Sequence, residues 1–127
     1  MKLATIVLAI SLFASGTTLA AEKHNHGHDH KPLHGGIVVE SKDMDYELVA
    51  KPDLLQLYLR DHGKPMDVSK ASAKITLLVG TEKQDVELKP SGNLLEAKGQ
   101  FKISAGTKVV AQVNVAGKMS SVRFTLK

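Results

Sequence analysis

The chain has 127 residues, a formal net charge of +4 and no cysteine. Without thiols it can form no disulfide, carry no lipid on a cysteine and offer no thiolate, so any metal must be held by nitrogen, oxygen or thioether groups. The basic residues are scattered, and the aromatic residues are two tyrosines and three phenylalanines. Nucleic-acid binding favours a basic stripe with stacking rings, and we therefore expect no nucleic-acid partner.

Residues 1–20 have the order found in a secretory signal peptide. One lysine precedes an apolar run from Leu3 to Ala14, and small residues follow as far as Ala20. The run is shorter than the ~20 apolar residues that span a bilayer as a helix. We therefore predict a cleaved signal peptide, export to the bacterial periplasm and no membrane span in the mature chain. The lack of cysteine is consistent with that compartment.

Residues 21–32 are predicted to form a flexible arm. The sequence AEKHNHGHDHK, which begins at Ala21, contains no large apolar side chain. It can therefore bury little surface to offset the entropy that is lost on ordering.

The arm carries histidines at alternate positions, namely His24, His26, His28 and His30. An extended chain places alternate side chains on one side, and Gly27 lets the chain fold around an ion instead. Neutral imidazole suits Zn, Cu and Ni, and its pKa near 6.5 leaves it available at pH 7. We predict that the arm binds a divalent transition metal, with Asp29 as a weaker candidate ligand. The alternative is a solvated leader that binds nothing.

The position of signal cleavage allows a second metal geometry. Cleavage after Ala20 leaves His24 fourth from the new amine, whereas cleavage after Ala21 leaves it third. A histidine in third place can complete a square-planar nitrogen site for Cu(II) or Ni(II). Cleavage after Ala21 puts Leu19 at the minus-three position, which fits a signal peptide less well than Thr18 does.

Beyond Pro32 the sequence has the pattern of an antiparallel β domain. Short apolar alternations are interrupted by turn residues about every ten residues, which is typical of a sandwich or barrel. We predict an all-β, immunoglobulin-like antiparallel β-sandwich over residues 33–127. The expected strands are 37–40, 46–51, 55–60, 73–79, 85–89, 94–97, 101–104, 109–115 and 119–126.

Alternation within these strands separates a core face from a solvent face. In the strand 55–60, the leucines point one way, and Gln56, Tyr58 and Arg60 point the other. The residues assigned to the core are Leu55, Leu57, Leu59, Ala73, Ile75, Leu77, Val79, Val109, Ala111, Val113, Val115, Val122, Phe124 and Leu126.

Two further histidines lie at the edge of the predicted domain. His34 precedes a pair of glycines that allow a close turn into the first strand, and His62 lies in a turn with glycine and proline. Each alone is more often a turn residue than a ligand. Together with Asp45 or Met66 they could form a second site, although a lone methionine more often fills a gap in the core.

Several motifs resemble a known group of proteins. The string PLHGGIVVE, followed by YELVAK, LYLRDHGKPMD and ITLLVG, resembles small periplasmic domains related to the N-terminal region of periplasmic adaptor proteins in RND-type heavy-metal efflux. The resemblance covers about Pro32 to Lys127. It implies an all-β domain near metal traffic and an efflux complex as partner. By position, His34 matches the histidine of HGG and His62 the turn histidine. A histidine found before ELV in relatives is replaced by Met44-Asp45-Tyr46, where Asp45 could still ligate Zn or Ni.

These observations predict a periplasmic metal-binding protein that buffers, scavenges or delivers Cu, Ni or Zn in heavy-metal resistance or efflux. The alternative is a non-catalytic interaction module that docks on an efflux or other envelope complex and has only incidental metal affinity. We expect no enzymatic activity, because the sequence contains no nucleophile elbow, phosphate loop or recognisable pair of catalytic carboxylates.

Overall fold

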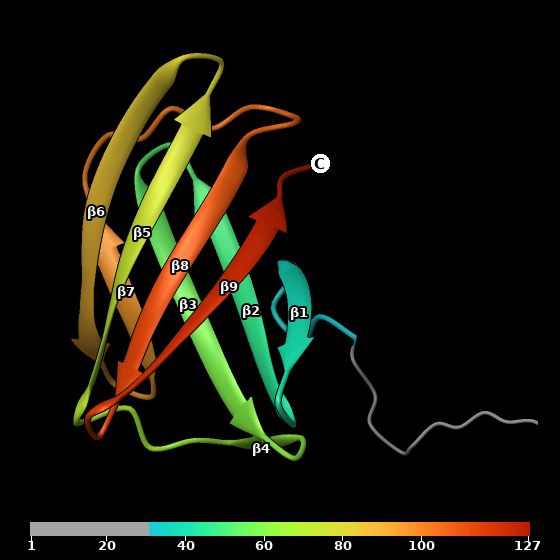
Figure 1. Ribbon diagram of the computed structural model, residues 1–127, viewed down its shortest axis with the longest axis vertical. Helices are drawn as coiled ribbons and strands as arrows, with labels where there is room; N and C mark the ends of the chain where they lie inside the picture. The colour runs from blue at the N-terminus through green and yellow to red at the C-terminus, as the bar shows by residue number, and fades with distance from the viewer. Residues whose placement is uncertain (1–30) are drawn as a thin grey trace, which may run out of the picture.

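A computed structural model describes residues 31–127, which form strands and connecting segments with no helix among them (Figure 1). The strands are β1 (Ile37–Ser41), β2 (Met44–Lys51), β3 (Leu54–Asp61), β4 (Lys64–Pro65), β5 (Ala71–Val79), β6 (Glu82–Ser91), β7 (Leu94–Lys98), β8 (Lys108–Val115) and β9 (Lys118–Thr125). All their pairings are antiparallel. The all-β prediction is thus confirmed for this part of the chain. The predicted signal peptide and most of the predicted arm lie outside the described residues.

The core follows the predicted alternation. The three leucines of β3 that were assigned to the core are at most 2% exposed, whereas Gln56 and Tyr58 on the opposite face are partly exposed. Val79 and Val115 are only partly buried because they lie at strand ends. The other buried residues that alternation predicted are Ala73, Ile75, Leu77, Val109, Ala111, Val113, Val122, Phe124 and Leu126. Burying a large aliphatic or aromatic side chain of this kind contributes about 1.5–3 kcal/mol.

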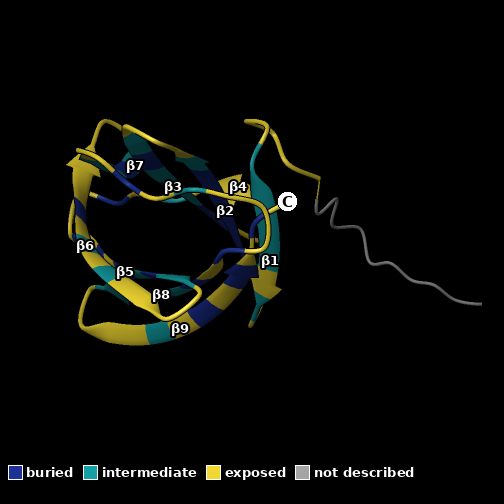
Figure 2. Ribbon diagram, turned by 90° about the horizontal axis from the view of Figure 1, so that it is seen from above, coloured by how far each residue is buried: buried dark blue, intermediate teal, exposed yellow. Residues whose placement is uncertain are grey.

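The hydrogen-bonded strands follow one path, β1-β2-β3-β7-β6-β5-β8-β9, with β4 beside β3. Strand β6 links the two halves of this path, because residues 82–88 pair with β5 and residues 89–91 pair with β7. At the ends of the path, β1 and β9 contact each other without a ladder of hydrogen bonds. The strands therefore surround the core as a nearly closed barrel (Figure 2).

Two short segments differ from the sequence prediction. Residues 101–104, predicted as a strand, form no ladder. Phe101 is nevertheless 9% exposed, and its N–H donates to the carbonyl of Pro52 at 2.7 Å. The apolar pattern there reflects a connecting segment that packs on the core. Conversely, β4 has two residues, too few to show any alternation, and pairs with the end of β3.

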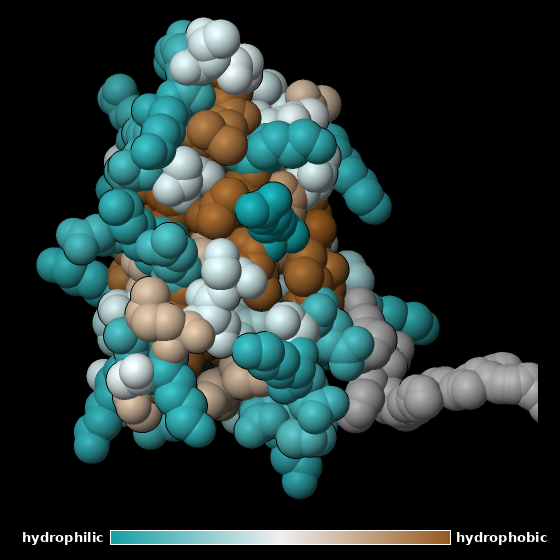
Figure 3. Space-filling model, in the orientation of Figure 1, coloured by the Kyte–Doolittle hydropathy of each residue, from teal (hydrophilic) through white to brown (hydrophobic). Residues whose placement is uncertain are grey.

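The face formed by β5, β8 and β9 shows hydrophobic atoms surrounded by hydrophilic side chains (Figure 3). The large hydrophobic side chains that are most exposed in the described part are Leu33, at 65%, and Met119, at 59%. Single exposed apolar residues of this kind are normal on protein surfaces. None of the described residues belongs to a helix with the length and hydropathy needed to cross a bilayer.

Candidate metal site

The segment before β1 is attached to β2 by a buried carboxylate. Glu47 of β2 is fully buried and accepts backbone N–H groups from Leu33 on Oε1 at 3.0 Å, and from His34 and Gly36 on Oε2 at 2.7 and 3.0 Å. The His34 ring donates from Nδ1 to Oε1 at 3.1 Å. Burying a carboxylate is unfavourable unless it is hydrogen-bonded. These four donors meet that requirement and hold residues 33–36 in place.

The two glycines after His34 have separate structural reasons. Gly35 has a φ of +78°, a region that other residues rarely adopt. A Cβ on Gly36 would overlap the carbonyl oxygen of Leu48 in β2. The HGG sequence therefore has a steric cause within the fold, independent of any ligand.

His34 is held on two sides. Its ring stacks on Tyr58 of β3, with centroids 3.6 Å apart and planes inclined by 4°, while Nδ1 is bound to Glu47. The side chain is still 41% exposed. Among the described residues, the polar contacts of this ring are made through Nδ1 and none through Nε2. Within residues 31–127, the imidazole thus has one anchored nitrogen, Nδ1, and one without a polar partner, Nε2.

The charge of Glu47 determines which nitrogen of His34 carries the proton. Burial alone would raise the pKa of Glu47, but hydrogen bonds from Gly36, His34 and Leu33 outweigh it and lower the pKa below its ordinary value. Glu47 is therefore ionised at neutral pH and can only accept hydrogen bonds. A neutral imidazole has one N–H, which must lie on Nδ1, so Nε2 has the lone pair that binds a metal.

The ring beneath His34 remains a neutral phenol. Burial raises the pKa of Tyr58, and the negative charges of Glu47 and Glu96 raise it further. A neutral phenol adds no second negative charge beside the Glu47 carboxylate.

His62 lies elsewhere, in the turn between β3 and β4. Its Nδ1 is 2.6 Å from Oδ1 of Asp61, and its Nε2 is 3.8 Å from Oδ2 of Asp43. His34 stacks on Tyr58 within β3, whereas His62 lies in the turn beyond the end of β3, and no group of three possible ligands among the described residues unites His34 and Glu47 with His62. The fold does not bring the two histidines together as one pair of ligands.

The weaker candidates on the folded part have other roles. Asp45 is 3% exposed, and its Oδ2 lies 3.8 Å from Nη2 of Arg60, whose positive charge already compensates the carboxylate. Met66 packs against the hydrophobic core. Arg60 was predicted to face solvent, but it is 5% exposed and donates to the carbonyl of Lys31 at 3.3 Å. Neither Asp45 nor Met66 therefore completes a site with His34.

Within residues 31–127, no three histidine, aspartate or glutamate side chains come together in a group that could hold a metal ion. The remaining predicted ligands lie outside the described residues; they are His24, His26, His28, His30 and Asp29. A metal site that includes His34 must therefore take further ligands from that part of the chain or from water.

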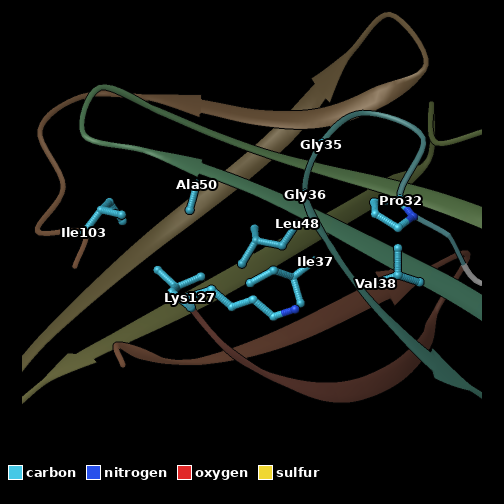
Figure 4. A pocket seen from close by; sticks show the side chains of 10 residues that line it. Pro32, Gly35, Gly36, Ile37, Val38, Leu48, Ala50, Ile103 and Lys127 are labelled. Atoms are coloured by element: carbon cyan, nitrogen blue, oxygen red, sulfur yellow. The ribbon is translucent and has the colours of Figure 1, made fainter. Parts of the chain in front are cut away.

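A groove of about 470 Å³ lies at the seam between β1 and the C-terminal residues (Figure 4). Its lining includes Gly36, Ile37, Leu48 and Ile103, and Lys127 is its ionisable side chain. Transition metals require histidine, carboxylate or sulfur donors in their first coordination shell. The groove lining includes none of these side chains, so the groove is not a candidate metal site.

Comparisons with known proteins assign no family. No family model matches the chain, and no curated protein matches it. One solved structure, described as the crystal structure of a Br derivative of BhCBM56, matches with a TM-score of 0.42 and 9% identity over 72% of this chain and 99% of that chain. A likeness at that level carries no argument about fold or function, and the function must be argued from the site.

Sequence reasoning did not single out Glu47. Glu47 and Asp45 alternate with apolar residues in β2, a pattern that indicates a solvent-facing side. Both are nevertheless buried. The available signal was the glycine pair after His34, which implies a close approach to some other part of the chain but does not say which.

Proposed function

We propose that this protein is an exported metal-binding protein that buffers or delivers Cu, Ni or Zn through the arm histidines and Nε2 of His34. The observation that carries the proposal is the ring of His34, held by Glu47 and Tyr58 with Nε2 open. His34 follows His30, the last of the four alternating histidines, by four residues. One ligand that is already ordered reduces the total conformational entropy that the set of ligands loses on binding.

The same proposal includes the cellular setting. The signal-like residues 1–20 support export to the periplasm, and the motifs from PLHGG onward support a link to heavy-metal efflux. The immunoglobulin-like classification of the domain also stays a proposal. Because most of the ligands come from a polar arm, metal selectivity should follow availability and the Irving–Williams order more than geometry.

We place His62 outside this site. Its ring is engaged with Asp61 and lies near Asp43, in the turn beyond the end of β3. A His62→Gln variant is therefore a matched histidine control for His34→Gln.

The proposal is tested by competitive titration of the secreted protein with Cu, Ni and Zn, after its N-terminus has been determined by mass. We expect sub-micromolar binding that is lost when His24, His26, His28 and His30 are all replaced by glutamine. His34→Gln should weaken binding, and His62→Gln should not. Unchanged affinity in the four-histidine variant would refute the role of the arm.

An interaction module is the second candidate, and the open seam favours it. Strands β1 and β9 are sheet edges beside an apolar groove, where an extended segment of a partner could add as a further strand. This candidate has only incidental metal affinity and therefore predicts no sub-micromolar metal binding by the secreted protein or by any variant in the titration above.

A further inference from the structure

We infer that Glu47 is the positioning residue of the metal site, holding His34 with its proton on Nδ1 so that Nε2 is the ligating nitrogen. This role rests on the proposed function, because it presupposes that His34 binds the ion. In this role the buried carboxylate of Glu47 contributes to metal binding although the carboxylate does not touch the metal.

The hydrogen bonds of Glu47 restrain both the backbone and the ring of His34. Oε1 accepts from the N–H of Leu33 and from Nδ1 of His34, and Oε2 accepts from the N–H groups of His34 and Gly36. Rotation of the carboxylate would break several of these bonds at once. The carboxylate therefore keeps its orientation, and the imidazole keeps a fixed position relative to β2.

The opposite support of the ring comes from the neighbouring strand. In the β2–β3 ladder Glu47 is paired directly with Tyr58, the residue on which His34 stacks. Both supports therefore project from adjacent strands whose relative position is set by backbone hydrogen bonds. Ligands that are supported by rigid elements are held more accurately than ligands on loops.

The chemistry of metal-bound histidine explains why such a carboxylate matters. A ligating imidazole usually donates its other N–H to a carboxylate or carbonyl, which selects the tautomer, orients the ring and makes the ligating nitrogen more basic. Loss of that partner typically weakens metal binding by about 10–100-fold. The His34–Glu47 pair has the arrangement that this role requires.

Glu47→Gln is the informative substitution. It preserves size but replaces one carboxylate oxygen with an NH₂ group that donates hydrogen bonds. An NH₂ group facing Nδ1 favours the tautomer with the proton on Nε2, which has no lone pair there for a metal. Glu96→Gln is the matched control, because Glu96 lies in β7, accepts a hydrogen bond from Gln56 at 2.9 Å and has no bond to His34.

The experiment is ¹H–¹⁵N NMR of the imidazole groups in the secreted protein, at a pH where free imidazole is neutral, with and without Zn²⁺ alone. His34 is assigned by its loss in His34→Gln. We expect the Nδ1–H tautomer in the unsubstituted protein and a zinc-induced shift at Nε2. Glu47→Gln should move the tautomer toward Nε2–H and weaken the zinc response of His34 by about tenfold or more, while Glu96→Gln changes neither.

The outcomes separate this role from the proposed function. If zinc shifts the arm histidines while His34 has an Nε2–H tautomer or no shift at Nε2, the role of Glu47 is refuted and metal binding by the arm stands. If zinc shifts no histidine, both are refuted. Should Glu47→Gln fail to fold, the tautomer and the zinc response of the unsubstituted protein still decide, because neither needs a variant.

Discussion

At the scale of single residues, one buried carboxylate accounts for several features of the N-terminal part of the domain. Glu47 binds the backbone of residues 33–36 and the ring of His34. The glycines that follow His34 allow the chain to approach β2 closely enough for these bonds. The same contacts that stabilise the fold therefore also present Nε2 of His34.

The lowered pKa of Glu47 makes stability depend on pH. Its pKa is lower in the folded protein than in the unfolded chain, so its stabilising contribution is complete above the unfolded value near 4.5 and is lost as the pH falls through the folded value. We expect Glu47→Gln to reduce the loss of stability on acidification, as measured by urea unfolding from pH 7 downward.

Glu96→Gln is the control for this pH prediction and should retain the dependence of the unsubstituted protein. Part of the dependence should persist in Glu47→Gln, because hydrogen bonds from Ser69 and Thr76 also lower the pKa values of Asp67 and Asp85. An identical pH profile for Glu47→Gln and the unsubstituted protein would show that Glu47 makes no such contribution.

Gly36→Ala should destabilise the protein by about 1–3 kcal/mol, the range for an overpacked site, because its Cβ would overlap a backbone oxygen of β2. The Cβ that Gly35→Ala adds would lie in open space, and only the positive φ of this residue is unfavourable for alanine. Gly35→Ala should therefore destabilise the protein less, by about 1 kcal/mol. Urea unfolding measures both. The prediction fails if Gly35→Ala is the more damaging of the two.

At the scale of elements, strands with strict alternation could be predicted from sequence, and segments whose role depends on tertiary contacts could not. The buried residues Val109, Ala111 and Val113 of β8 follow a period of two, as the core leucines of β3 do, and a single strand imposes this period on itself. Residues 101–104 are apolar for a different reason, since Phe101 covers the core from a connecting segment. Local pattern alone cannot distinguish these two causes.

Phe101→Ala should therefore destabilise the domain by about 3–5 kcal/mol, as expected for truncation of a buried phenylalanine, although no strand is lost. Ile103→Ala, in the same segment but only partly buried, should cost clearly less. Thermal and urea unfolding measure the difference. Equal and small losses would mean that this segment does not contribute to the core.

At the scale of the whole molecule, the candidate site joins a part that sequence could identify with one that it could not. The arm histidines are visible in the sequence, as is the position of His34 at the edge of a β domain. The partner of His34 was not predictable, because Glu47 lies 13 residues further along the chain and meets His34 only once β1 and β2 have paired. Sequence spacing also could not show whether His34 and His62 lie together; the structure places His62 in the turn beyond β3 and stacks His34 on Tyr58 within that strand.

The most direct test of a shared ion is the effect of Zn²⁺ on the free energy of unfolding. An ion held by the arm alone leaves this free energy unchanged, because the arm offers the same ligands when the domain unfolds. An ion that also binds His34 stabilises the folded state, by up to about 2.7 kcal/mol at free zinc one hundred times the Kd. We predict a zinc-dependent increase in the unsubstituted protein and in His62→Gln that is absent in His34→Gln. An unsubstituted protein that binds zinc with no change in its unfolding free energy would contradict this prediction.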